Sequence, residues 1–117
     1  MAAPLDRGRI LADFHFAVNM SADALETWLA TPESLRVGSK KDGGESVGHA
    51  SGREIVRILR ADPDSLEKED LAHMRKVVGF VRRHRAQEPA NIVTSRWRWS
   101  LMNWGHDPLQ EDGTRTA

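Results

Sequence analysis

The most strongly helical stretch of the chain occupies residues 64–86, which read DSLEKEDLAHMRKVVGFVRRHRA. Asp64 and Glu67 have the spacing of a capping box, so we expect the helix to begin beside them. Its apolar residues recur at intervals of three and four, which places them on one face about 120° wide. These residues are Leu71, Met74, Val77, Val78 and Val81. The pattern predicts a long amphipathic helix whose apolar face packs in a protein core.

The opposite face of this predicted helix is basic. Two small residues, Ala72 and Gly79, lie between two rows of cations, which are Arg75 with Arg82 and Lys76 with Arg83. Cations in the last turn of a helix complement its dipole, but Arg75 and Lys76 lie too far from the end for that effect. Small residues between cations would let a phosphate backbone approach the helix closely. We therefore interpret this face as a candidate nucleic-acid surface.

A shorter helix, predicted over residues 53–60, has the same organisation. Its apolar residues are Ile55, Val56, Ile58 and Leu59. Its basic residues, on the opposite face, are Arg53, Arg57 and Arg60. If the two basic helices pack side by side, their cations would line one surface, in outline like a helix-turn-helix. The acidic connection between them is slightly longer than that motif uses.

Short amphipathic segments flank the two basic helices. One helix is predicted over residues 6–18, a second is capped by Ser21, and a single turn runs from Pro32 to about Leu35. The last helix begins at Thr94 or Ser95 and ends at Trp104, followed by Gly105 in the usual position after a helix. Trp97, Leu101 and Trp104 share one face of it, so we expect them to be buried.

The fold class that follows is all-α, a compact array of about five helices. No stretch shows sustained alternation of apolar and polar residues, so no strand is expected. The helices form a single domain over residues 6–108, and residues 109–117 are predicted to be a polar, disordered tail.

One long glycine-rich loop is predicted over residues 38–52. Loops of this length inside a compact domain are usually functional or disordered. Lys40 and Lys41 in this loop are candidate phosphate contacts, and a surface turn without function is the alternative. The loop does not match a phosphate-binding P-loop, because no Gly-Lys-Ser/Thr follows at the required spacing.

The composition of the 117 residues excludes several classes of protein. The chain has no cysteine, which excludes disulfides, thiol nucleophiles, zinc fingers and iron–sulfur clusters. Hydrophobic residues make up 39% and charged residues 29%, a mixture typical of a globular protein. No apolar run approaches the roughly 20 residues of a membrane span. We expect a cytoplasmic protein that does not bind membranes.

The net charge is zero, but the charges are distributed in blocks. Residues 1–35 carry −3, residues 36–60 carry +3, residues 61–74 carry −4, residues 75–98 carry +6, and residues 99–117 carry −2. Blocks of one sign can produce a local field for a charged partner. The alternative is that the blocks pair with one another inside the fold.

Neither a metal site nor an active site is indicated. The five histidines are His15, His49, His73, His84 and His106, and no two have the spacing of a helical metal pair. The segment around Ser46, His49 and Ser51 is not a nucleophile elbow, and nothing fixes an acid–base pair. We therefore expect no metal, no cofactor and no enzymatic activity.

Four blocks of sequence together resemble a known family. They are NMS with LE and WLAT within residues 19–31, KKDGGESVGH with SG within 40–52, AHMRKVVGFV at 72–81, and WR with SLMNWGHDP within 97–108. The chain is similar to the small bacterial and fungal domain-of-unknown-function family numbered thirty-one-forty. The resemblance supplies no catalytic residues. Because some members carry a DNA-binding label, it implies a partner of that class.

The function predicted from these observations is nucleic-acid binding, with duplex DNA as the partner and low sequence specificity. The cations named above in the two basic helices and the loop would contact phosphates, and no Asn or Gln set is placed to read bases. The alternative is a protein-interaction module or a homodimer, in which the acidic residues 61–74 of one chain meet the basic residues 75–98 of another.

Overall fold

The computed structural model describes residues 6–38 and 44–110, and over these residues the predicted all-α class is confirmed. The described residues contain no strand. The helices are α1 (Arg7–Ala17), α2 (Ala22–Leu29), α3 (Pro32–Arg36), α4 (Val47–Arg60), the 3-10 turn η1 (Pro63–Ser65), α5 (Lys68–Arg85) and α6 (Arg96–Asn103). None of the described helices is both long enough and apolar enough to cross a bilayer.

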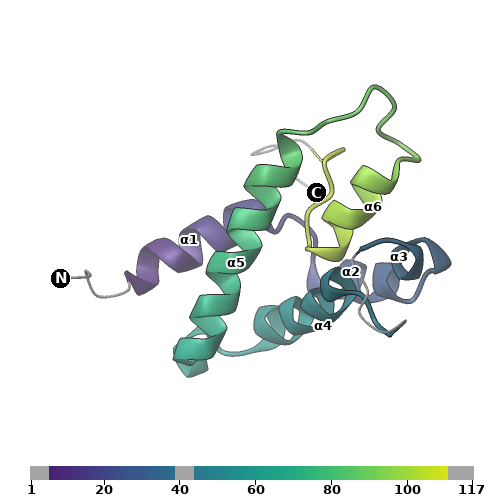
Figure 1. Ribbon diagram of the computed structural model, residues 1–117. Helices are drawn as coiled ribbons and strands as arrows, with labels where there is room; N and C mark the ends of the chain where they lie inside the picture. Colours follow the sequence, from purple (N-terminus) through teal and green to yellow (C-terminus); the bar gives the residue numbers. More distant parts are fainter. Residues whose placement is uncertain (1–5, 39–43, 111–117) are drawn as a thin grey trace.

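The helices pack in two pairs joined by α6 (Figure 1). α1 packs against α5 although more than 50 residues separate them, and α2 packs against α4. α6 contacts α2, α3, α4 and α5, so it connects the two pairs. The core contains a fully buried side chain from each of α1, α2, α4, α5 and α6; in that order these are Phe14, Leu25, Ile55, Met74 and Leu101.

Side-chain caps start the helices where the sequence predicts them. The Ser21 hydroxyl accepts from the backbone N–H of Ala24 and begins α2, and Ser95 accepts from Arg98 and begins α6. Gly105 follows α6 with a φ of 82°, the left-handed conformation that glycine adopts readily. The predicted core face of residues 64–86 is also confirmed, because all five of its apolar residues are buried.

The predicted loop over residues 38–52 is wrong from residue 47 onward, because α4 begins at Val47 with Ser46 as its cap. Two of the glycines that suggested a loop lie inside this helix, where they allow close packing. A Cβ on Gly48 would lie 2.9 Å from Nε1 of Trp104, and one on Gly52 would lie 2.6 Å from the backbone oxygen of Asn103. Lys40 and Lys41 lie outside the described residues.

The start of α5 also differs from the prediction. The capping box is formed by Glu67 and Asp70, one turn later than the Asp64–Glu67 pair expected from the sequence. Asp62 instead caps η1, because Pro63 begins a separate short turn. The three-residue spacing of a capping box was the correct signal, but both the Asp64–Glu67 pair and the Glu67–Asp70 pair have it.

The aromatic face of α6 is buried only in part. Leu101 and Trp104 are shielded from solvent, with Trp104 at 5% exposure. Trp97 is partly buried and packs against the edge of the core. Its indole Nε1 donates to the backbone oxygen of His84 at 2.6 Å, at the end of α5. Of the predicted tail, only Leu109 and Gln110 fall within the described residues.

Candidate nucleic-acid interface

The three arginines of α4 are engaged in ion pairs within the chain. Arg60 donates to Asp23 at 2.7 Å and to Glu26 at 3.1 Å, which links α4 to α2. Arg57 binds Glu54 on its own helix and also Asp70 at the start of α5. These contacts lower the pKa of Glu26, chiefly through its hydrogen bond to Arg60. The arginines of α4 therefore pair with acids of the same chain, as the alternative interpretation of the charge blocks predicts.

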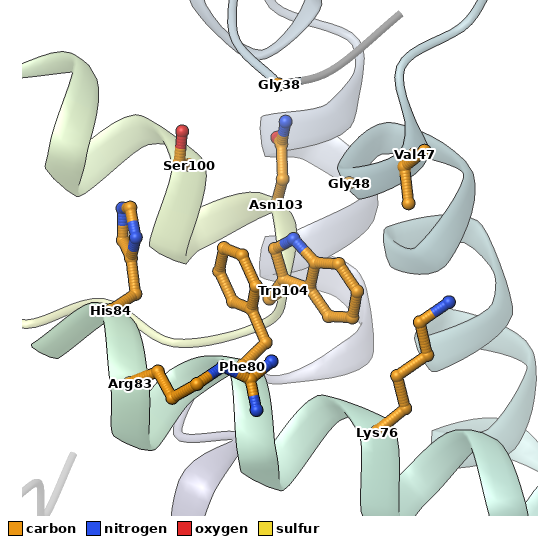
Figure 2. Close-up of a pocket in the computed structure, with 10 residues that line it drawn as sticks. All are labelled: Gly38, Val47, Gly48, Lys76, Phe80, Arg83, His84, Ser100, Asn103 and Trp104. Atoms are coloured by element: carbon orange, nitrogen blue, oxygen red, sulfur yellow. The ribbon is translucent and has the colours of Figure 1, made fainter. Parts of the chain in front are cut away.

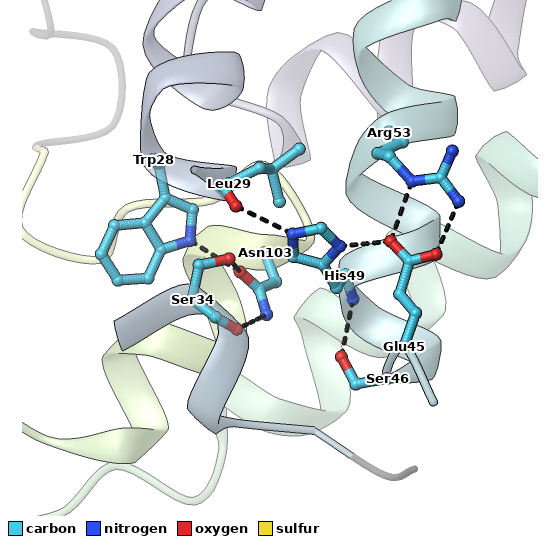
Figure 3. Close-up of polar contacts among 8 residues, drawn as sticks. All are labelled: Trp28, Leu29, Ser34, Glu45, Ser46, His49, Arg53 and Asn103. Carbon is cyan, nitrogen blue, oxygen red and sulfur yellow. Dashed lines mark hydrogen bonds and ion pairs between the residues drawn. The ribbon is translucent and has the colours of Figure 1, made fainter. Parts of the chain in front are cut away.

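The third arginine, Arg53, belongs to a cluster around Glu45 just before α4 (Figure 3). Arg53 donates to both carboxylate oxygens of Glu45, at 2.8 Å from Nε and 2.6 Å from Nη2. His49 contacts the same carboxylate through Nδ1, and its Nε2 lies 2.8 Å from the backbone oxygen of Leu29. Hydrogen bonds from Arg53 and then His49 lower the pKa of Glu45 from 4.5 to about 2.

The cations of α5 are in a different state. Arg75, Lys76, Arg82 and Arg83 are exposed. None of the four forms an ion pair or a side-chain hydrogen bond with another residue in the described part of the chain. Between their two rows lie Ala72, which is exposed, and Gly79, over which the guanidinium of Arg83 folds: a Cβ on Gly79 would lie 3.1 Å from Arg83 Nη1. A phosphate that approaches this face meets cations with no carboxylate to displace.

A pocket of about 440 Å³ lies beside this face, where α5 meets α6 and the start of α4 (Figure 2). Lys76 lies on one side of it and Arg83 on the other, with Phe80 and Trp104 between them. Val47 from α4 contributes an apolar side chain that is 42% exposed. Among the described residues, none that lines this pocket is an aspartate or a glutamate.

The aromatic residues beside the pocket form a stack of five rings. Trp104 and Phe80 are the closest pair, with centroids 4.3 Å apart and planes 13° from parallel. The stack continues from Phe80 to His84 at 4.9 Å and then to Trp97 at 6.1 Å, and on the other side from Trp104 to His73 at 6.4 Å. Offset stacking of this kind stabilises aromatic pairs beyond their buried area. Because the faces cover one another, ring edges remain available to the pocket.

Two polar atoms in this stack have no partner among the described residues. The indole Nε1 of Trp104 makes no hydrogen bond there, although Trp28 and Trp97 both donate from theirs. Nε2 of His84 is buried and also has none, and burial lowers the pKa of this histidine. Buried polar groups usually find partners. The Trp104 indole N–H is therefore a donor beside the pocket with no partner among the described residues, whereas Nε2 of His84 is closed off from it.

Histidines on α4 and α5 otherwise serve the packing. The side chain of His73 lies 3.0 Å from the hydroxyl of Ser51, and burial lowers its pKa. Ser51 is 4% exposed on α4, and together with His73 it lines a second pocket of about 340 Å³. The described residues include no group of three histidine or acidic side chains placed to hold a metal ion. Whether the protein binds a metal is not tested by this, and the absence of metal stays a prediction.

Asn103, at the end of α6, lines the pocket and also joins α6 to α2 and α3 (Figure 3). Its Oδ1 accepts from Nε1 of Trp28 at 2.7 Å and from the hydroxyl of Ser34 at 2.5 Å. Its Nδ2 donates to the backbone oxygen of Ser34 at 3.1 Å. Since Asn103 is 1% exposed, this amide fixes α2, α3 and α6 relative to one another and holds Trp104 in place.

The comparison with known families agrees with the sequence resemblance. A family described as a protein of unknown function, DUF3140, matches residues 13–102, which is most of the chain. The chain belongs to the DUF3140 family. The searches of curated proteins and of solved structures found no match. The family description of DUF3140 names no ligand, so the function has to be argued from the structure.

In this DUF3140 protein, sequence reasoning located the α5 cations but missed the pocket beside them. The structure brings Lys76 and Arg83 to the pocket without ion pairs to described residues, whereas the arginines of α4 are paired with acids. Lys76 also lines the second pocket with Glu45 and Glu54, the acids that pair with Arg53 and Arg57. One signal was present, because Lys76, Phe80 and Arg83 have the spacing of a single helical face. The contributions of Val47 and Trp104 have no local signal, since they come from other helices.

Proposed function

We propose that this DUF3140 protein binds nucleic acid, with duplex DNA as the partner, through phosphate contacts of the α5 cations. One observation carries the proposal: four exposed cations on one helix make no ion pair with any described residue. They are Arg75, Lys76, Arg82 and Arg83. Phosphate contacts of this kind supply most of the affinity in sequence-independent binding.

The geometry of α5 supports contact with a strand rather than base reading. Residues seven positions apart are about 10 Å apart along a helix, so each row of two cations can reach separate phosphates. Between the rows, the exposed Ala72 allows close approach, and at Gly79 a phosphate would meet the guanidinium of Arg83. α5 contains no Asn or Gln, the side chains that bind adenine through two hydrogen bonds. We therefore propose low sequence specificity.

The arginines of α4 are weaker candidates for the same role. A phosphate that binds Arg53, Arg57 or Arg60 has to displace a carboxylate that is already in place. The acidic block of the homodimer alternative is also partly engaged, because Asp70 binds Arg57 and the backbone N–H of Glu67. No observation favours that alternative over nucleic acid.

The test compares two double variants with the same change in charge. Arg75→Ala with Arg82→Ala removes two cations that have no ion pair, and Arg53→Ala with Arg60→Ala removes two that are paired. Binding to short duplexes of two sequences is measured by fluorescence anisotropy from about 50 to 200 mM salt, the range over which phosphate contacts weaken steeply. We expect the first variant to flatten the dependence of log affinity on log salt by about two, and the second to leave it near wild type.

Two results would contradict this proposal. Wild-type protein that fails to bind any duplex at about 50 mM salt excludes phosphate-driven binding, which is strong under those conditions. Unchanged DNA affinity in the α5 variant, together with a change in oligomeric state measured by light scattering, would instead favour the protein-interaction alternative.

A further inference from the structure

The pocket between α4, α5 and α6 has a chemistry that a flat phosphate surface does not need. Its two ends are cationic, with Lys76 at one and Arg83 at the other. Phe80 and Trp104 lie between them, and Val47 lies on the Lys76 side (Figure 2). Its volume of about 440 Å³ falls within the range of small-molecule sites, roughly 300–1,000 Å³. Such a pocket suits a ligand with an apolar body and negative charge at both ends.

The middle of the pocket favours hydrogen-bond acceptors. Aromatic rings carry partial positive charge at their edges, and the stack exposes edges because the ring faces cover one another. The unpartnered indole N–H of Trp104 is a donor on the edge that lies against Gly48. Because none of the described carboxylates lines the pocket, an acceptor-bearing anion meets no like charge from those residues.

A nucleotide unit within a strand has this arrangement of groups. Its base is flat and apolar on both faces, its edge carries carbonyl or ring-nitrogen acceptors, and a phosphate lies on its 5′ side and on its 3′ side. We propose that the pocket binds one unpaired nucleotide, with its base against Val47, Phe80 and Trp104 and its two phosphates on Lys76 and Arg83. Every base has an acceptor edge, so the pocket accepts different bases.

This inference deepens the proposed function, because it narrows nucleic-acid binding to strands that offer an unpaired base. A duplex keeps its bases stacked and paired, whereas a bulge or a single-stranded end presents one without that cost. The same chemistry is present in a free nucleoside 3′,5′-bisphosphate. The experiment therefore includes both sources.

The first arm compares three DNA duplexes of the same length and sequence. One is fully paired, one carries a single bulged thymidine, and one carries an abasic site in the bulge. Affinities are measured by fluorescence anisotropy at about 100 mM salt, because salt sets the phosphate contribution. We expect the thymidine bulge to bind about tenfold more tightly than the paired duplex, about the gain from one hydrogen bond to the Trp104 indole, and the abasic bulge to lose that gain.

A matched pair of variants assigns the gain to the pocket. Val47→Glu places a carboxylate at the pocket, at an exposed position that leaves the core intact. Val93→Glu makes the same change at another exposed valine that does not line this pocket. We expect Val47→Glu to abolish the preference for the bulge and Val93→Glu to retain it. A preference that survives in both variants overturns the pocket as its origin.

The second arm uses thymidine 3′,5′-bisphosphate and follows the indole N–H resonances by NMR, with Trp104→Phe to assign the Trp104 signal. A base that accepts from Nε1 should shift this resonance, and the shift should be absent in Val47→Glu. The indoles of Trp28 and Trp97 serve as internal controls because they already donate to Asn103 and His84.

The outcomes separate this inference from the proposed function. Equal affinity for all three duplexes and no shift of Trp104 overturn the pocket proposal and leave duplex binding intact. A pocket-dependent shift with the bisphosphate, without binding to any DNA, supports a free-nucleotide site and contradicts the proposed function. A bulge preference lost in Val47→Glu supports both.

Discussion

A single buried amide, that of Asn103, joins three helices that the sequence does not show to be neighbours. Its side chain satisfies the Trp28 indole and both the hydroxyl and the backbone oxygen of Ser34. An Asn near the end of a short helix carries no local signal of this role, since its partners lie 69 and 75 positions away. Capping residues such as Ser21 and Ser95 were predictable because their partners lie within three residues.

Asn103→Ala tests this role. The change leaves the partners on α2 and α3 without hydrogen bonds, and groups left unpaired in a protein interior cost about 1–3 kcal/mol each. We expect the free energy of unfolding, measured by urea denaturation, to fall by about 2–3 kcal/mol. The loss is not larger because the partly exposed indole of Trp28 can donate to water instead. The control is Asn91→Ala, at an exposed asparagine, which should change little. Equal stability of the two variants would contradict a structural role for the amide.

Glu45 gives the protein a specific response to acid. Arg53 and His49 lower its pKa in the folded state to about 2, below the ordinary 4.5. A carboxyl with a depressed pKa contributes stability above its unfolded pKa, and that contribution is lost as the pH falls toward the folded value. We expect Glu45→Gln to be less stable than wild type above about pH 5, with the difference shrinking as the pH falls from 4.5 to about 2.

The measurement is chemical denaturation at a series of pH values. Glu88→Gln, at an exposed glutamate, is the control and should show no such convergence. Because Glu45 is partly open to solvent, high salt should reduce the effect. A constant difference between wild type and Glu45→Gln over the whole pH range would contradict the ion pairs at the start of α4.

Helix α4 shows why element boundaries are the harder part of a sequence prediction. Glycines favour a loop when only local conformational freedom is considered, and the sequence from 38 to 52 has five of them. Gly48 and Gly52 are instead required inside a helix because α6 and α2 lie against their backbone. The apolar spacing on α5 was enough to predict that helix, because the pattern arises within one helix. The need for glycine in α4 could not be predicted in this way, because it depends on a second helix that packs against its backbone.

Two glycine substitutions separate these effects. Gly52→Ala places a Cβ 2.6 Å from the backbone oxygen of Asn103, and overpacking of about 1–3 kcal/mol exceeds the gain in helix propensity of about 1 kcal/mol. Gly8→Ala in α1 meets only Asp6 at 3.7 Å, an ordinary contact. Thermal melts should show Gly52→Ala destabilised by about 1–2 kcal/mol and Gly8→Ala stabilised by about 0.5 kcal/mol. Stabilisation by both would contradict the close packing of α4 on α6.

At the scale of the whole molecule, the charges sum to zero, but the described cations divide into a group that forms ion pairs with other described residues and a group that does not. The cations of α4 pair with acids from the first block and from the acidic connection, through Arg60 with Asp23 and Arg57 with Asp70. Four cations of α5 make no such pairs in the described part of the chain; they are Arg75, Lys76, Arg82 and Arg83. Net charge and block charges were available from the sequence, but which block meets which depends on the packing of α2 on α4. The sequence therefore located all the cations without separating the two groups.

The turn after α6 closes the molecule onto its first two helices. Asn19 and Asp107 exchange two hydrogen bonds, at 3.0 and 2.7 Å, and Arg98 holds the same aspartate through both carboxylate oxygens. The backbone N–H of Met20 donates to Gly105, and Nδ1 of His106 lies 2.7 Å from the backbone oxygen of Ala17. Residues 105–108 are therefore part of the domain rather than a connection to a tail.

Two shortened chains test this closure and the predicted domain boundary at residue 108. A chain that ends after Pro108 keeps the contacts of Gly105, His106 and Asp107, so we expect a cooperative melt close to that of the full chain. A chain that ends after Trp104 loses all of these contacts. At about 1 kcal/mol for each hydrogen bond, its free energy of unfolding should fall by more than about 4 kcal/mol. Since domains of this size are stable by only about 5–15 kcal/mol, it should melt at a much lower temperature or lack a cooperative transition.

Asp107→Ala in the full chain separates the loss of these contacts from the loss of chain length. It removes the side-chain contacts to Arg98 while the backbone of the turn remains, so its melt should lie between those of the two shortened chains. If the chain that ends after Trp104 melts like the full chain, the turn contributes nothing to the fold and the domain ends with α6. If the chain that ends after Pro108 is also strongly destabilised, residues 109–117 belong to the domain and the predicted boundary is wrong.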